Sequence, residues 1–219
     1  MAGPDPTRRA VFLDRDGTLI HDPGYLADPA GVILFEGVGD ALRALRDAGF
    51  ELVVCTNQSG IARGRYDEAA YRRVAARLGE LLAAEGVALL ATYHCPYHPE
   101  GTVPELARDH PDRKPAPGMW LRAAADHGID LARSYSIGDG ERDVVAGTRA
   151  GTTSILLAAG RDKWPLPVDG PFDPAFTARD LREAVLWILR REGLPLPARP
   201  GAPISARAAG PASVNGPRS

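Results

Sequence analysis

Short apolar runs alternate with longer amphipathic stretches along most of this chain. The apolar runs predict buried strands over residues 9–14, 51–56, 88–94, 134–139 and 152–157. The stretches between them have apolar residues at helical spacing and predict helices over residues 38–48, 67–85, 117–127, 141–150 and 178–192. Strands that alternate with helices are typical of a parallel sheet with helices on both faces. The pattern therefore predicts an α/β fold, a doubly wound, Rossmann-like parallel sheet of about five strands.

Cap residues mark the expected starts of several helices. Asp67 is a favourable N-cap for the helix over 67–85, and Pro117 suits the first position of the next helix. Thr177 and Asp180 have the spacing of a capping box, so we expect the last helix to begin directly after Thr177.

Two long segments, 19–37 and 95–116, have neither the apolar runs of a buried strand nor the spacing of an amphipathic helix. Loops of that length in a compact domain usually have a function. The first residues, 1–8, are rich in proline and predict a flexible leader. Residues 194–219 are rich in Pro, Ala and Gly with few apolar side chains, which predicts a disordered tail. We expect one domain over residues 9–193.

Composition and charge narrow the classes of protein. The 219 residues include 26 Lys and Arg against 28 Asp and Glu, and this net charge of −2 gives no indication of a nucleic-acid or membrane surface. The apolar runs fall far short of the ~20 residues that a membrane-spanning helix needs, and the N-terminus lacks the pattern of a secretory signal. Two cysteines, Cys55 and Cys95, are too few for a disulfide scaffold, so we expect a reducing, cytoplasmic setting.

Two acids follow the first predicted strand, Asp14 and Asp16, and Gly17 then allows a sharp turn. Ligands bind at the carboxyl ends of strands in open α/β sheets, so these acids are placed to share a divalent cation and to act as nucleophile and proton donor. A solvated acidic turn is the simpler alternative. A calcium-binding EF-hand loop is excluded, because Thr18 and Leu19 occupy the positions that need an oxygen ligand and a glycine.

Polar residues also follow the other predicted strands or lie just beyond them. They are Thr56 with Asn57, Lys114, and Asp139 with Asp143 four residues later. Each has an ordinary explanation alone, as a helix cap, a solvated charge or an acid that answers a helix dipole. Together they predict one polar site, because the carboxyl ends of parallel strands meet at the same edge of a sheet.

These four motifs, in this order, resemble the haloacid dehalogenase (HAD) superfamily of phosphatases over about residues 9–190. A narrower similarity is to the D-glycero-D-manno-heptose-1,7-bisphosphate 7-phosphatases. It rests on residues 56–64 (TNQSGIARG), on Cys95-Pro96 followed by His98-Pro99-Glu100-Gly101, and on Arg113-Lys114-Pro115. The histidinol-phosphate phosphatases share much of the same pattern.

The resemblance implies a covalent mechanism. Asp14 would attack phosphorus, while Asp16 would protonate the leaving oxygen and then activate the water that hydrolyses the aspartyl-phosphate. The hydroxyl of Thr56, the backbone N–H of Asn57 and the ammonium of Lys114 would stabilise the phosphoryl oxygens.

The resemblance also implies a cofactor, Mg²⁺. Its expected ligands are Asp14, the backbone carbonyl of Asp16, and Asp139, with waters and a phosphate oxygen. Asp143 would hold either Lys114 or a metal-bound water.

No cap domain is inserted between the motifs, so only loops can form the rim of the site. A shallow rim suits a small sugar phosphate, whose second anionic group would meet Arg63, Arg65 or Arg113. We predict Arg63 and Arg113 as substrate-binding residues, together with Asn57 and Lys114.

One segment departs from the two families, which usually hold structural zinc through Cys-x-His and a later Cys-x-Cys. Here the corresponding residues are Cys95-Pro96-Tyr97 and His110-Pro111-Asp112. We expect the loop to fold without a metal, with Cys95 as a small buried apolar residue. The alternative is a zinc site of Cys95, His98, His110 and Asp112.

The leading hypothesis is therefore a Mg²⁺-dependent monomeric phosphatase for a heptose bisphosphate. A histidinol-phosphate phosphatase, or another small sugar-phosphate phosphatase, is the alternative within the same chemistry. A polynucleotide phosphatase is disfavoured, because no basic stripe follows a nucleic-acid backbone. The alternative from another class is a phosphate-binding protein without catalysis, but such a protein would be expected to lack Asp14 or Asp16.

Overall fold

Six parallel strands form the centre of the part of the chain that the computed structural model describes, residues 8–158 and 172–197. The strands are β1 (Ala10–Leu13), β2 (Glu51–Asn57), β3 (Ala91–Cys95), β4 (Tyr135–Gly138), β5 (Thr153–Leu157) and β6 (Phe176–Ala178). Their order across the sheet is β3-β2-β1-β4-β5-β6, and every neighbouring pair is parallel. The doubly wound parallel fold is therefore confirmed.

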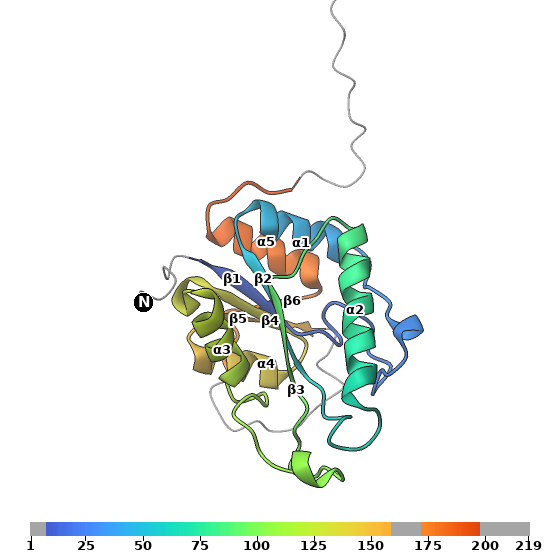
Figure 1. Cartoon of the computed structure of the whole chain (residues 1–219). Helices are drawn as coiled ribbons and strands as arrows, with labels where there is room; N and C mark the ends of the chain where they lie inside the picture. Colours follow the sequence, from blue (N-terminus) through green and yellow to red (C-terminus); the bar gives the residue numbers. More distant parts are fainter. Residues whose placement is uncertain (1–7, 159–171, 198–219) are drawn as a thin grey trace, which may run out of the picture.

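Helices cover both faces of this sheet (Figure 1). They are α1 (Val38–Asp47), α2 (Glu68–Ala84), α3 (Gly118–His127), α4 (Glu141–Ala150) and α5 (Leu181–Arg191). Helices α1 and α5 lie side by side and share one apolar cluster with α2, while α3 and α4 pack on the opposite face. The two-layer covering explains why the strands are apolar on both sides.

The alternation of side chains along β1 assigns them to the two faces of the sheet. Val11 and Leu13 belong to the cluster beneath α1, α2 and α5, whereas Ala10 and Phe12 belong to the cluster beneath α3 and α4. The ring of Phe12 lies 5.9 Å from that of Trp120 on α3. All four residues of β1 are buried, so the strand fixes the position of the chain that follows it.

The C-terminal part of the fold differs from the sequence prediction. Thr177 lies in β6 and pairs with Leu156 of β5, so it is not a helix cap. The cap of α5 is Asp180, whose side chain accepts a hydrogen bond from the N–H of Glu183, and Glu183 in turn accepts from the N–H of Arg179. A three-residue strand has too little alternation to be recognised in the sequence, and the prediction of about five strands missed it.

At the carboxyl edge of the sheet, the connections after β1 and β3 are irregular segments that contain short 3-10 turns. Between β1 and α1 the chain forms the short 3-10 turn η1 (Pro29–Gly31), and between β3 and α3 it forms η2 (Pro104–Leu106). A third 3-10 turn, η3 (Leu131–Arg133), precedes β4. In the described parts of the chain no helix is both long and apolar enough to cross a membrane.

The predicted leader and tail fall almost wholly outside the described residues. Of the leader, the structure describes Arg8, which forms an isolated bridge with Ile129; of the tail it describes 194–197. Residues 159–171, between β5 and β6, also lie outside the described residues.

Candidate active site

The site begins where the winding of the sheet reverses. The chain moves outward through β2 and β3 on one side of β1, and through β4, β5 and β6 on the other. Asp14 directly follows β1 and Asp139 directly follows β4, and the N–H of Asp14 donates to the carbonyl of Ile137 at 3.0 Å. The two acids therefore flank the crevice between neighbouring strand ends, which is the usual ligand position in this class of fold.

The turn after β1 fits closely around Asp139. Gly17 has φ of +80°, and a Cβ at this position would lie 2.0 Å from Oδ2 of Asp139. Only glycine meets both conditions, because other residues disfavour this backbone and would collide with the carboxylate. The turn is closed by the N–H of Gly17, which donates to the carbonyl of Ile20 at 2.8 Å. The sequence signal Asp-Gly thus corresponds to a close approach of the turn after β1 to the end of β4.

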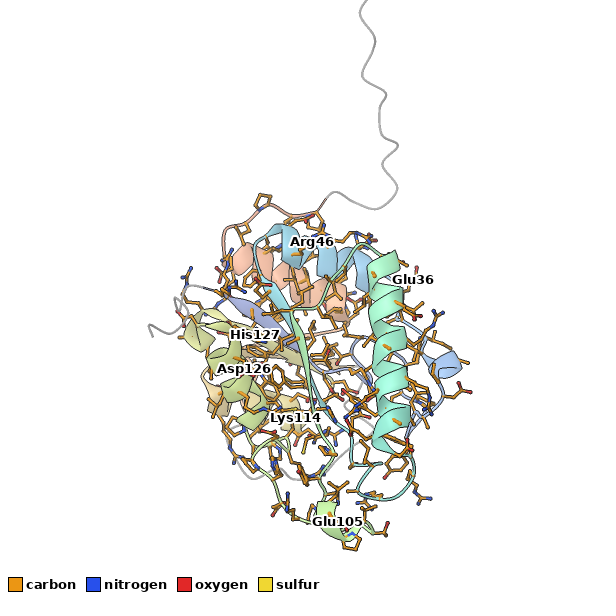
Figure 2. All side chains as sticks on the ribbon, viewed as in Figure 1. Glu36, Arg46, Glu105, Lys114, Asp126 and His127 are labelled. Carbon is orange, nitrogen blue, oxygen red and sulfur yellow. The ribbon has the colours of Figure 1, made fainter. Side chains whose placement is uncertain are left out.

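Lys114 lies at the centre of the site and is almost fully buried. Its Nζ is 2.8 Å from Oδ1 of Asp14 and 2.5 Å from Oδ1 of Asp143, and it donates to the carbonyl of Cys55 at 3.0 Å. Burial opposes its charge, but the two carboxylates outweigh burial and raise the pKa of Lys114. Figure 2 shows Lys114 inside the fold toward the end of the sheet with the 95–117 loop, and Arg46 at the opposite end.

Two neighbours fix the position of this lysine. Asn57 holds its backbone with a pair of hydrogen bonds, from Nδ2 to the carbonyl of Lys114 at 3.1 Å and from the N–H of Lys114 to Oδ1 at 3.0 Å. Asp143 stands in the first turn of α4, where its Oδ2 accepts from the N–H of Gly140 at 3.0 Å. Asp143 was expected to hold either Lys114 or a metal-bound water, and in the structure it contacts Lys114.

The acidic residues form a compact group that suits a divalent cation. One carboxylate oxygen of each of Asp14, Asp139 and Asp143 lies within 4.8 Å of the others. Burial, followed by repulsion from Asp14 and Asp143, raises the pKa of Asp139 to about 7. Mg²⁺ is a hard cation that prefers oxygen ligands, and a cation bound here would relieve the repulsion between the buried carboxylates. The residues of the group therefore fit Mg²⁺.

Thr56 and Asn57, at the end of β2, open onto the same cavity as Asp14, Asp16 and Lys114. The cavity is lined by further residues that the sequence argument had not assigned to it, namely Asp22, Tyr25, Gln58, Tyr66 and Arg142. Arg142 lies between Asp139 and Asp143 at the start of α4. Its position next to these two acids is the feature of the sequence that could have indicated its place at the site. The structure thus brings together the predicted catalytic and metal-binding side chains.

The predicted rim arginines differ in their surroundings. Arg113 lines the cavity, and its guanidinium donates to the carbonyl of Tyr97 at 3.3 Å. Arg63 is outside the lining and pairs with Glu100 at 2.9 Å and with His98 at 3.0 Å. Contact between Arg63 and the substrate stays a prediction. In the structure the guanidinium of Arg63 forms an ion pair with Glu100.

The proposed zinc residues are engaged in other contacts. The ring of Tyr97 stacks on that of His110 with 4.1 Å between centroids, and Arg122 pairs with Asp112 at 2.8 Å. Cys95 is buried, as expected for a small apolar residue. Among the His, Cys, Asp and Glu side chains of the described residues, those close enough together to hold a metal are the aspartates Asp14, Asp139 and Asp143. Cys95, His98, His110 and Asp112 do not form such a group, so the zinc alternative has no support here and a metal-free loop stays a prediction.

A doubly wound sheet with Asp14, Asp139, Asp143 and Lys114 at its switch point is the arrangement expected from the resemblance to the HAD phosphatases. Comparison with known proteins agrees. A family model described as HAD-hydrolase-like matches residues 112–184. A D-glycero-β-D-manno-heptose-1,7-bisphosphate 7-phosphatase of Mesorhizobium japonicum is 41% identical over 179 residues, 82% of this chain and 79% of that protein. The enzyme of that name from Escherichia coli K12 is 43% identical over 157 residues, 71% of this chain and 82% of that protein.

Solved structures are similar as well. The D,D-heptose 1,7-bisphosphate phosphatase of B. bronchiseptica, in complex with magnesium and phosphate, has a TM-score of 0.70 and 30% identity over 84% of this chain and 99% of its own. A HAD-like phosphatase of Mesorhizobium loti has a TM-score of 0.73 and 38% identity over 87% and 91% of the two chains. This chain belongs to the HAD phosphatase family of the D-glycero-D-manno-heptose-1,7-bisphosphate 7-phosphatases.

Proposed function

We propose that this chain hydrolyses the 7-phosphate of D-glycero-β-D-manno-heptose 1,7-bisphosphate with Mg²⁺ as its cofactor. The observation that supports it most is the buried contact of Lys114 with Asp14 and Asp143 beside Asp139, in a chain 41–43% identical to enzymes of that name. The β configuration is taken from the names of those relatives.

Asp14 acts as the nucleophile in this proposal. Its Oδ1 accepts from the N–H of Arg15 at 2.7 Å and lies 2.8 Å from Nζ of Lys114, so the carboxylate is held in one orientation. The ammonium of Lys114 and the hydroxyl of Thr56 stabilise the charge on the phosphoryl oxygens as the new bond forms. Asp14 is released when water attacks the aspartyl-phosphate.

Asp16 transfers protons in both steps. It protonates the leaving oxygen of the sugar, and it then accepts a proton from the attacking water. Burial is the main cause that raises the pKa of Asp16, an effect that favours a carboxyl able to donate its proton.

A bound Mg²⁺ would be held by Asp14, Asp139 and the backbone carbonyl of Asp16, and it would offset the repulsion between the carboxylates and a phosphate dianion. The remaining steps depend on side chains of the chain itself. Asp143 keeps Lys114 in place and charged while the phosphoryl group is transferred.

The rim of the cavity favours a substrate with a second anionic group. Arg113 and Arg142 both line it. Burial is the main cause that lowers the pKa of Arg113, and the positive charge of Arg142 lowers it further, which shows that the two guanidinium groups are near each other. A phosphate on C1 of the sugar is the group that this pair would attract. An amine, as in histidinol phosphate, would be repelled by the same pair.

We propose a reducing, cytoplasmic setting, since Cys55 and Cys95 are free thiols. We also propose that the protein is a monomer. The test of the function is phosphate release by purified protein with Mg²⁺ from a panel of esters. The panel contains both anomers of the heptose bisphosphate, histidinol phosphate, fructose 1,6-bisphosphate and a nucleotide. A kcat/KM about a hundredfold higher for the β anomer than for any other ester supports the proposal, and a preference for another ester contradicts it.

A further inference from the structure

An arginine separates the two motif aspartates, and its side chain turns back onto the second one. Nε of Arg15 donates to Oδ1 and Oδ2 of Asp16 at 3.1 and 3.2 Å, and Nη2 donates to Oδ2 at 3.0 Å. The side chain of Arg15 is 2% exposed and lies over the ring of Tyr71, 5.7 Å from its centroid. A bidentate pair of this kind fixes the plane of a carboxylate as well as its position.

Gln58 ties the same carboxylate to Thr56. Its Nε2 donates to Oδ2 of Asp16 at 3.0 Å and to Oγ1 of Thr56 at 2.8 Å. Its Oε1 accepts from Nη2 of Arg15 at 3.0 Å and from the hydroxyl of Tyr66 at 2.6 Å. Both hydrogens of the amide and both lone pairs of its oxygen are therefore used, and the arginine donor fixes which end of the amide is oxygen.

These contacts have a consequence for Thr56. Because its oxygen accepts a hydrogen bond from Gln58, its own hydrogen is left to donate in another direction. Thr56 lines the cavity, where the phosphoryl oxygens of a substrate would be the acceptors. One amide group thus orients both a proton donor for phosphate and the carboxylate that serves the leaving group.

We propose that Arg15 and Gln58 are positioning residues for the proton-transfer step. They hold Asp16 in the plane and at the distance from Thr56 that leaving-group protonation needs. This inference rests on the proposed function, in which Asp16 exchanges protons with the leaving oxygen and with water. Nη1 of Arg15 is buried without a hydrogen-bond partner among the described residues, which lowers the stability of the fold. An apolar side chain would avoid this cost, so a purely structural role does not explain an arginine at this position.

The experiment separates the two steps of the reaction with two kinds of ester. Arg15→Met and Gln58→Leu are compared with wild type on a sugar phosphate, whose alkoxide leaving group needs a proton. The same proteins are compared on 4-nitrophenyl phosphate, whose leaving group does not. The first turnover is followed by rapid mixing and the steady state in the same trace.

On the sugar phosphate, kcat is expected to fall about 10²- to 10⁴-fold in both variants, with KM changed by less than about threefold. On 4-nitrophenyl phosphate the first turnover is expected to stay within about tenfold of wild type. A slow steady state follows, because water attack on the aspartyl-phosphate still needs Asp16. A burst of nitrophenolate that wild type lacks is the signature of this partial block. Equal falls in the first turnover on both esters overturn the proposal.

A matched control comes from the other end of β1. Arg9 also pairs with a carboxylate, that of Glu192 at 3.0 Å, and lies over a ring, 4.3 Å from the centroid of Phe50. Arg9→Met is expected to keep both rates, so a loss equal to that of Arg15→Met would show a general effect of removing such an arginine and overturn the proposal.

A second variant covers the case in which Gln58→Leu does not fold. Gln58→Glu has the same size but lacks the amide hydrogens for Asp16 and Thr56, and we expect the same burst from it; its absence counts against the proposal. If wild type ignores the heptose bisphosphate but hydrolyses another alkyl phosphate, the proposed substrate fails. The variant-to-wild-type ratios on that other ester then decide the role of Arg15 and Gln58.

Discussion

Replacing Asp139 by asparagine is expected to stabilise the metal-free protein at pH 8. Burial and the neighbouring Asp14 and Asp143 raise the pKa of Asp139 from 3.8 to about 7. Each tenfold change in proton affinity corresponds to about 1.4 kcal/mol, so ionisation of Asp139 costs the folded state on the order of 4 kcal/mol relative to the unfolded chain. Asparagine keeps the size of the side chain and removes this cost.

The sign of the pH dependence follows from the proton count. Between pH 4 and pH 7 the unfolded chain has already lost the proton of Asp139 while the folded protein keeps it, so stability falls as the pH rises. The loss is complete above pH 7 and absent below pH 4. Wild type and Asp139→Asn are therefore expected to differ in free energy of unfolding by up to about 4 kcal/mol at pH 8, and hardly at all near pH 4.

The assay is urea unfolding followed by circular dichroism, in EDTA and in Mg²⁺, at several pH values. Mg²⁺ is expected to stabilise wild type strongly and the variant weakly, because binding to the folded state alone adds to stability. Glu105→Gln, on η2 at the outer end of the fold in Figure 2, is the control and is expected to change stability by less than about 0.5 kcal/mol. An Asp139→Asn protein no more stable than wild type at pH 8 in EDTA would refute the reasoning.

Four further predictions concern the nucleophile, its lysine, the rim and the 95–113 segment. Asp14→Asn is expected to lower phosphate release by at least about 10⁴-fold with an unchanged circular-dichroism spectrum, and near-normal turnover would exclude the covalent mechanism. Lys114→Met leaves two carboxylates buried without their cation, so urea unfolding is expected to show a loss of about 3–5 kcal/mol; a loss below about 1 kcal/mol contradicts the buried ion pairs. Arg113→Ala is expected to raise KM about tenfold for a sugar bisphosphate and little for a monophosphate, and an equal rise for both would place Arg113 away from the second phosphate. Elemental analysis is expected to find far less than one zinc atom per chain. Tyr97→Ala is expected to lose about 1 kcal/mol of stability with or without chelator, whereas a loss confined to chelator-free protein would indicate a metal.

Residues at the ends of predicted strands were the part of the site that the sequence could locate. Asp14 and Asp139 follow apolar runs directly, and the parallel arrangement of those runs brings their ends together whatever the details of packing. Lys114 follows no strand directly, and its place was indicated by the resemblance to a family. In the structure its backbone is held by Asn57, at the end of β2, which is why a loop residue is positioned as firmly as a strand residue.

Side-chain direction was the part that periodicity could not predict. Gln58 follows β2 in a loop, where no regular repeat relates its side chain to the carboxylate of Asp16. Its orientation depends on contacts with Arg15, Thr56 and Tyr66 from three separate segments. The stack of Tyr97 on His110 likewise joins residues that are thirteen positions apart in an irregular segment. Contacts between side chains in loops therefore could not be predicted from periodicity, and the three-residue strand β6 could not be predicted either.

The charges of the site connect its stability to its chemistry. Its carboxylates are those of Asp14, Asp16, Asp139 and Asp143, and the cationic side chains in direct contact with them include Arg15 and Lys114. When all six groups are ionised they carry a net charge of −2, which Arg142 at the same cavity offsets in part and a bound cation would offset further. Removing any of these carboxylates is therefore expected to stabilise the metal-free protein and to weaken its response to Mg²⁺, unless a cationic side chain loses its partner. Removing Asp139 breaks none of the ion pairs given above for Arg15 and Lys114, so it is the position at which gain in stability and loss of metal binding should separate most cleanly.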